Sequence, residues 1–484
     1  MRGDLLAPIG VALLAAACST ARTEPAERTW PAWLSPCVVT GLEGDARCGT
    51  VSVAESPQAP DGRRIAIRVV VVPARSPQPA ADPMLLLAGG PGQGAADLAA
   101  AMAQRGDLLR DERDLVLIDQ RGTGSSNGLQ CSTRPAAALM GQIFEAAHLA
   151  ACREELAARA DLTRYTTSAA AEDYPIALDA LGYRQVNVWG VSYGTRVGLE
   201  LTRRYPDRVR TLLVEGVVPP SFTWPKHGAA DFQAALDALV EDCAADASCA
   251  RAFPRFRDEI ATAFARLKAR RVTVEVYDPA TRRTEHVLFG VTDLAYSTRG
   301  LLYGNESLAL PQLFHDAAQG RYEGFAQAYV TRARTLERQI ARGVHLGVYC
   351  AEDLPFVNWS RAYERASDTL MATYLIDQYH GACDVWPGAS IPASFREPVT
   401  TSVPVLAMAG RRDPVTPPRT AEAIAKTLPR SRALIWRNGA HGTDGLVSPN
   451  CRAGIIREFV ASADPHALDV SCMSRDPALP FRVP

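Results

Sequence analysis

The stretch that decides the fold reads Val186-Asn187-Val188-Trp189-Gly190-Val191-Ser192-Tyr193-Gly194, and residues 195–205 follow it with helical spacing. The apolar run before Gly190 predicts a buried strand. A serine between two glycines, at a turn from a strand into a helix, is typical of a nucleophile elbow, since glycine avoids the clashes that this strained turn imposes. An ordinary turn between a strand and a helix is the alternative. We predict that Ser192 is a nucleophile.

Short apolar runs recur on both sides of Ser192 and predict further strands, at 49–53, 65–72, 84–88, 115–119, 212–215, 403–409 and 433–436. The first two of these runs predict a hairpin. Helical spacing occurs between the later runs, for example at 169–181. Strands that alternate with helices, each strand being an unbroken apolar run, predict a mainly parallel, doubly wound sheet covered on both faces.

The alternation of strands and helices stops between residues 219 and 402, where helical segments dominate at 229–243, 256–269 and 322–342. It resumes after residue 402. We therefore predict an α/β-hydrolase fold with a core formed by residues 37–218 and 403–484, interrupted by a mostly helical cap insertion at 219–402.

A nucleophilic serine needs a base, and the base needs a carboxylate that orients it. In α/β-hydrolases the order along the chain is serine, acid, histidine. Asp413 follows the strand predicted at 403–409, and His441 lies in a glycine-flanked loop after the strand predicted at 433–436. We predict that these two residues complete a triad. Asp444 is a weaker candidate for the acid because it follows the histidine, and a surface histidine is the alternative for His441.

The oxyanion of an acyl-transfer reaction needs two N–H donors. The backbone N–H of Tyr193 is the first candidate, and the loop Gly89-Gly90-Pro91-Gly92 after an earlier predicted strand offers Gly90 as the second. A glycine-rich loop after a strand is also found in phosphate-binding sites, but the lysine and threonine of a P-loop are missing here. The mechanism predicted from these residues needs no cofactor.

The chain has eleven cysteines. Without Cys18, ten remain, and they fall in near neighbours that predict five disulfides in an oxidising compartment. The predicted pairs are Cys37–Cys48, Cys131–Cys152, Cys243–Cys249, Cys350–Cys383 and Cys451–Cys472. Zinc binding is the alternative, but no Cys-x-x-Cys occurs, so we predict no metal site.

The N-terminus has the sequence pattern of an export signal. Residues 1–18 combine Arg2, a short apolar run and Ala15-Ala16-Ala17-Cys18, a pattern typical of a signal peptide with a lipobox at Cys18. Ordinary cleavage, with Cys18 incidental, is the alternative. Residues 19–36 are predicted to form a tether. The protein is thus expected to be exported, as a periplasmic or cell-envelope lipoprotein or as a secreted protein, and to meet a membrane only through a lipid anchor.

The formal net charge is −1, and charged residues make up 22% of the chain. Such a balance offers no overall field to hold nucleic acid, so we predict no nucleic-acid partner. Nothing in the composition indicates an oligomeric state.

Five motifs occur in order along the chain: Gly-Gly-Pro-Gly, Asp-Gln-Arg-Gly-Thr-Gly, Gly-x-Ser-Tyr-Gly, Gly-x-x-Asp-Pro-Val-Thr-Pro and Gly-x-His-Gly. Together they resemble the secreted tripeptidyl aminopeptidases, which are relatives of the proline iminopeptidases. The resemblance runs from about Cys37 to Cys472 and includes a C-terminal segment like theirs. It implies an α/β-hydrolase core, a helical cap and a peptide substrate with a free N-terminus, from which short peptides or single residues are removed.

The resemblance also implies acidic residues that bind the α-ammonium group of the substrate. The segment Cys350-Ala351-Glu352-Asp353 is similar to one in that family, so Glu352 is the first candidate and Asp353 the second. Glu215, after a core strand, is the third. The alternative for each is a solvated surface acid.

Two other functions remain open from the sequence. The same triad serves esterases and other small-molecule hydrolases, which need no amine-binding acid. A lipoprotein that uses an inactive hydrolase fold for binding is the second alternative.

Overall fold

The computed structural model describes residue 1 and residues 28–42, 45–105, 107, 109–134, 136–141, 144–441 and 446–484. The chain divides into two units, Met1–Trp30 and Pro31–Pro484, and the second unit contains the elements discussed here. The predicted signal peptide and lipidated Cys18 lie outside the described residues.

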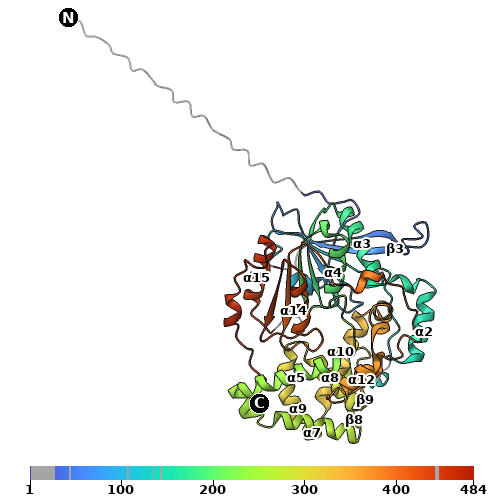
Figure 1. Cartoon of the computed structure of the whole chain (residues 1–484), viewed down its shortest axis with the longest axis vertical. Helices are drawn as coiled ribbons and strands as arrows, with labels where there is room; N and C mark the ends of the chain where they lie inside the picture. The colour runs from blue at the N-terminus through green and yellow to red at the C-terminus, as the bar shows by residue number, and fades with distance from the viewer. Residues whose placement is uncertain are drawn as a thin grey trace. The chain divides into compact units, whose positions relative to one another are not determined.

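A central sheet organises the second unit (Figure 1). The described residues form nine strands in the order β1-β2-β3-β5-β4-β6-β7-β10-β11. Neighbours are antiparallel from β1 to β5 and parallel from β5 to β11. The predicted hairpin and mainly parallel sheet are therefore confirmed. The bounds are β1 Ser35–Cys37, β2 Ala46–Ala54, β3 Arg64–Val72, β4 Met84–Leu87, β5 Leu115–Ile118, β6 Val186–Val191, β7 Val209–Glu215, β10 Val405–Gly410 and β11 Ser431–Trp436.

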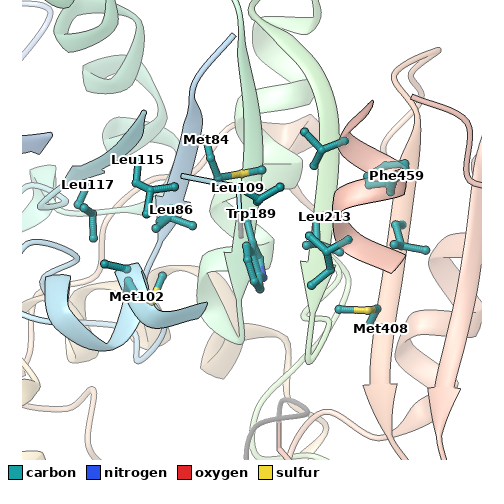
Figure 2. Close-up of a cluster of buried hydrophobic side chains, with 14 of the residues drawn as sticks. Met84, Leu86, Met102, Leu109, Leu115, Leu117, Trp189, Leu213, Met408 and Phe459 are labelled. Carbon is teal, nitrogen blue, oxygen red and sulfur yellow. The ribbon is translucent and has the colours of Figure 1, made fainter. Parts of the chain in front are cut away.

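Helices cover both faces of this sheet. On one face, α1 (Ala99–Arg105) and α15 (Pro449–Ser462) contribute to a buried apolar cluster that includes Trp189, Leu213 and Met408 (Figure 2). On the other face, Gly198 of α4 (Tyr193–Arg204) approaches the side chains of Val188 and Leu212, which alternate with the first set. Full burial of an aliphatic side chain stabilises a fold by about 1.5–3 kcal/mol, so the unbroken apolar strands hold the sheet between its two helical layers. Helices α2 (Ala146–Ala157) and α3 (Thr167–Leu181) precede β6, and α14 (Pro418–Thr427) connects β10 to β11.

Between β7 and β10 the chain forms a mostly helical segment (Figure 1). Its helices are α5 Gly228–Ala245, α6 Ala247–Ala252, α7 Phe256–Ala269, α8 Val291–Leu301, α9 Leu310–Ala318, α10 Glu323–Gln339, α11 Arg342–Val348, α12 Trp359–Ala366 and α13 Tyr374–Tyr379. The strands β8 (Val272–Asp278) and β9 (Arg283–Phe289) form a separate two-stranded antiparallel sheet in this segment.

The helix expected at 322–342 is divided in the structure, because α10 ends at Gln339 and α11 begins at Arg342. At the break, Ile340 pairs with Gln93 in an antiparallel bridge and the Ala341 N–H donates to the Gly92 carbonyl oxygen at 2.8 Å. These are contacts between segments far apart in the sequence, and helical periodicity alone does not reveal them.

The described residues contain the five predicted disulfides, Cys37–Cys48, Cys131–Cys152, Cys243–Cys249, Cys350–Cys383 and Cys451–Cys472. Disulfides persist mainly in oxidising compartments, which agrees with export. In the part of the chain that the structure describes, none of the helices has the length and hydropathy required to cross a bilayer.

Candidate active site

Ser192 occupies a strained turn between β6 and α4, with φ 54° and ψ −125°. Its N–H donates to the Glu215 carbonyl oxygen at 2.8 Å. The flanking glycines have no room for a side chain: a Cβ on Gly190 would lie 2.4 Å from the Gly194 carbonyl oxygen, and one on Gly194 would lie 2.4 Å from the Leu87 carbonyl oxygen. Both contacts are with backbone, so the turn requires glycine on either side of the serine.

His441 and Asp413 lie next to each other at the carboxyl ends of β11 and β10. The imidazole Nδ1 is 3.0 Å and 3.1 Å from the two Asp413 carboxylate oxygens. The carboxylate also accepts from the N–H groups of Val415 and Thr416 at 2.8 Å and from the Thr416 hydroxyl at 2.6 Å. With Nδ1 facing the carboxylate, the proton is assigned to Nδ1 and Nε2 is left as the acceptor.

Asp413 is buried. Burial acts to raise the pKa of its carboxyl, but His441 and the hydrogen bonds from Thr416 outweigh burial, so the pKa lies below its usual range. The carboxylate is therefore ionised at neutral pH and suits the orientation of an imidazolium. Tyr303 supports the histidine from the helical segment. Its carbonyl oxygen accepts from the His441 N–H at 3.1 Å, and the two ring centres are 4.7 Å apart.

A narrow cavity of about 30 Å³ lies at Ser192. Gly90, Tyr193 and Thr416 contribute to its wall, as do apolar and aromatic side chains of Val218, Phe222, Trp224, Val348 and Tyr349. Among the described residues, none is hydrogen-bonded to the Ser192 hydroxyl. Catalytic hydrogen bonds are often long before a substrate binds, so this geometry is compatible with a nucleophile and its base.

The glycine loop that lines the cavity is held in place by residues of the helical segment. The Gly90–Pro91 peptide bond is cis, and Gly90 has φ 114°, in the region that favours glycine. The Pro91 carbonyl oxygen lies 3.1 Å from Nδ1 of His345, and the Gly92 carbonyl oxygen accepts from the Ala341 N–H. The backbone position of Gly90 thus depends on α11 as well as on the core.

The Asp-Gln-Arg-Gly-Thr-Gly motif contacts residues that hold the site in place. Gln120 donates to the Tyr193 hydroxyl at 3.2 Å. Arg121 is buried and forms two hydrogen bonds with the Asp173 carboxylate, at 2.6 and 2.7 Å. These contacts hold the first turns of α3 and α4 beside the motif.

The three acids expected to bind an amine occupy different positions. Glu215 is the buried last residue of β7. Arg452 donates to its carboxylate at 2.7 Å and the Trp189 indole donates to it at 3.3 Å. Glu215 does not line the cavity. Glu352 is fully buried, and its carboxylate accepts from the N–H and hydroxyl of Thr167 at 2.7 and 2.8 Å.

Asp353 lies in the wall of the Ser192 cavity. It belongs to a π-helical turn, Tyr349–Asp353. Arg196 lies between the two neighbouring acids, 3.0 Å from Asp353 and 3.3 Å from Glu352. Burial raises the pKa of Glu352 to about 7, although Arg196 and Thr167 act in the opposite direction. Burial also raises the pKa of Asp353, against the same arginine.

Several residues of the site were missed from the sequence. Arg196 lies in the first turn of α4, but its acidic partners come from a distant segment, so no local spacing identifies it. Trp224, Tyr303 and Tyr349 come from the helical segment. Only the folded chain brings Trp224 and Tyr349 to the Ser192 cavity and Tyr303 to His441.

The chain belongs to the family described as alpha/beta hydrolase fold, whose model matches residues 82–443. It is a hydrolase of that family. It is 26% identical over 331 residues to a tripeptidyl aminopeptidase of Streptomyces coelicolor, covering 64% of this chain and 58% of that protein. It therefore spans a little over half the length of this relative.

The chain is also 23% identical over 463 residues to the serine protease Hip1 of Mycobacterium tuberculosis, covering 87% of this chain and 85% of that protein. Among solved structures, the proline iminopeptidase of Mycobacterium smegmatis is similar with 17% identity and a TM-score of 0.42, over 87% of this chain and all of that one.

Proposed function

We propose that this hydrolase is a serine exopeptidase that removes short peptides or single residues from the free N-terminus of peptides. Ser192 attacks the scissile carbonyl, His441 takes its proton, and Asp413 orients the imidazole. The N–H groups of Tyr193 and Gly90 stabilise the oxyanion. His441 then protonates the leaving amine, and water hydrolyses the acyl-enzyme.

The observation that carries the proposal is the charge balance at Asp353. Within ion-pair distance, two buried carboxylates share one guanidinium, that of Arg196. Arg396 donates to the Glu352 backbone carbonyl oxygen and acts on the two carboxylates only at longer range. Within ion-pair distance, the two carboxylates are therefore short of one positive charge when both are ionised. A substrate ammonium in the cavity supplies that charge, and a neutral or acylated N-terminus does not.

This geometry favours Asp353 over Glu352 as the amine anchor, because Asp353 borders the cavity and Glu352 does not. Both acids accept from Arg196, and Glu352 is further held by Thr167. Glu352 contributes through Arg196. Glu215 has no place in the proposed site. The relatives that are named as peptidases support a peptide substrate, and an esterase would have no need of the acidic group.

The test is mass spectrometry of the products from a library of free-amine peptides and the same peptides N-acetylated. We expect cleavage near the N-terminus of the free-amine set only. The Asp353→Asn variant should raise KM for free-amine peptides at least tenfold, and Asp258→Asn, at an exposed acid of α7, should not. Equal cleavage of both sets by the wild-type protein would contradict the exopeptidase proposal and favour an esterase or a general hydrolase.

A further inference from the structure

Two arginines of the helical segment lie around Tyr303, the residue that contacts His441. The guanidinium of Arg332 is 4.1 Å from the centre of the Tyr303 ring. Arg299 is 5.5 Å from the same ring and donates to the Tyr303 hydroxyl at 3.2 Å. Arg299 is also 4.9 Å from the ring of Trp224, which lines the Ser192 cavity. The pair is thus one residue removed from the base, through Tyr303, and Arg299 is one residue removed from the cavity, through Trp224.

Among the described residues, neither arginine has a carboxylate within ion-pair distance; Glu306 acts on Arg332 and Asp231 acts on Arg299 only at longer range. Arg299 and Arg332 are half-buried. Three fully buried arginines, Arg121, Arg196 and Arg334, each pair with a carboxylate at 2.6–3.0 Å. The Nε atom of Arg299 is buried and has no hydrogen-bond partner. Burial lowers the pKa of Arg332, and the charge of Arg299 contributes in the same direction. Two neighbouring, partly desolvated cations are stabilised by an anion that reaches both.

The position of the pair relates it to one part of a substrate. In the proposed reaction His441 delivers a proton to the leaving amine, so the residue after the scissile bond must lie beside the imidazole. Tyr303 packs on that imidazole, with ring centres 4.7 Å apart. A group on the leaving residue can therefore approach the guanidinium groups that surround Tyr303.

We propose that Arg299 and Arg332 form a subsite for a carboxylate carried by the leaving part of the peptide. The carboxylate is either the C-terminus of a short leaving peptide or an acidic side chain next to the scissile bond. Two guanidinium groups suit a carboxylate because each offers N–H donors in a planar fork. The inference rests on the proposed peptidase function and adds a preference for short or acidic substrates.

The experiment uses three peptides with one acyl part, chosen from a peptide that the enzyme cleaves. The residue after the scissile bond is glycine with a free carboxylate, glycine amide, or aspartic acid amide. The wild-type protein should cleave the glycine acid with a kcat/KM at least tenfold above that of the amide, chiefly through KM. The aspartic acid amide reports whether a side-chain carboxylate serves equally.

The variants Arg299→Gln and Arg332→Gln should bring the ratio of acid to amide close to one, and Arg299→Lys should retain part of it. Arg321→Gln, which removes an exposed arginine paired with Asp316, is the matched control and should keep the wild-type ratio. Thermal unfolding of each variant identifies any that fail to fold, in which case Arg299→Lys and Arg332→Gln carry the comparison.

Equal cleavage of the glycine acid, the glycine amide and the aspartic acid amide by the wild-type protein overturns the inference while leaving the peptidase proposal intact. So does an Arg299→Gln variant that is folded and keeps the full preference for the acid. A wild-type protein that cleaves none of the free-amine peptides overturns both proposals.

Discussion

The Nδ1 atom of His345, a residue of the helical segment, lies 3.1 Å from the carbonyl oxygen of Pro91 in the loop beside Ser192. Burial and the charge of Arg342 lower the pKa of His345 to about 3, so the ring is uncharged at neutral pH. Nδ1 faces a carbonyl oxygen, which only accepts, and must therefore carry the proton and donate it. The same ring packs edge-on against Tyr349, with centres 4.6 Å apart.

If the hydrogen bond to Pro91 holds the loop in place, the His345→Phe variant should lower kcat about fivefold and change KM little, because one net hydrogen bond is worth about 1 kcal/mol. The His345→Asn variant retains a donor near the Nδ1 position and should recover most of the rate. Steady-state kinetics on one cleaved peptide measures both values. Retention of activity in His345→Phe and its loss in His345→Asn would instead assign His345 a packing role. His380→Phe, away from the cavity, is the control.

Glu352 should make the stability of the protein fall as the pH rises. Burial raises the pKa of Glu352 from 4.5 to about 7. A carboxyl whose folded pKa is raised contributes stability below its unfolded pKa, and that contribution is lost as the pH passes through the folded pKa. The loss between about pH 4.5 and pH 8 amounts to about 3 kcal/mol, at about 1.4 kcal/mol for each pH unit.

Urea unfolding of the wild-type protein and of Glu352→Gln at pH 5, 7 and 8 measures this loss. As the pH rises, the unfolding free energy of the wild-type protein should fall relative to that of Glu352→Gln, since glutamine has no charge to bury. The groups that face the carboxylate are Arg196, Asp353, Thr167 and the Tyr193 hydroxyl. A wild-type protein that gains stability over the variant with rising pH would mean that Arg196 keeps Glu352 ionised.

The backbone of Ser192 should store strain that glycine relieves. A non-glycine residue at φ 54° and ψ −125° costs about 1–3 kcal/mol. We expect the free energy of unfolding of Ser192→Gly to be about 1 kcal/mol larger than that of Ser192→Ala. Both variants lack the hydroxyl, and only alanine keeps a Cβ at this strained position. Denaturant unfolding of the two variants gives this difference directly. An alanine variant as stable as the glycine variant would show that the turn is relaxed.

The disulfides should differ in their contribution to stability. Cys350–Cys383 closes 33 residues and holds the turn that carries Asp353, whereas Cys243–Cys249 closes only 6. The chain-entropy relation predicts a loss of about 4 kcal/mol when the first pair is replaced by serine and about 2 kcal/mol for the second. Thermal unfolding of the two double variants compares them. Equal losses would mean that chain entropy does not govern these bonds.

The core of the fold could be predicted from the sequence because its strands are unbroken apolar runs and its turns carry glycine for steric reasons. Ser192, Asp413 and His441 stood out because each follows a strand in the order that the chemistry requires. The five disulfides could be paired because their partners are close neighbours along the chain.

The substrate side of the site could not be predicted in the same way. Arg196, Trp224 and Tyr303 act through contacts between distant segments, and no local pattern marks them. The ranking of Glu352 before Asp353 came from a resemblance in sequence. The π-helical turn Tyr349–Asp353 determines which of the two adjacent acids faces the cavity, and no sequence pattern predicted that turn.

The central claim is that Ser192 is an activated nucleophile, and the most direct measurement is intact-mass and peptide-mapping spectrometry after treatment with a fluorophosphonate. We expect a single adduct on Ser192 in the wild-type protein. We expect none in Ser192→Ala, and much slower labelling in His441→Ala, where the base is lost. A folded wild-type protein that stays unlabelled, or that is labelled at another residue, would contradict the account.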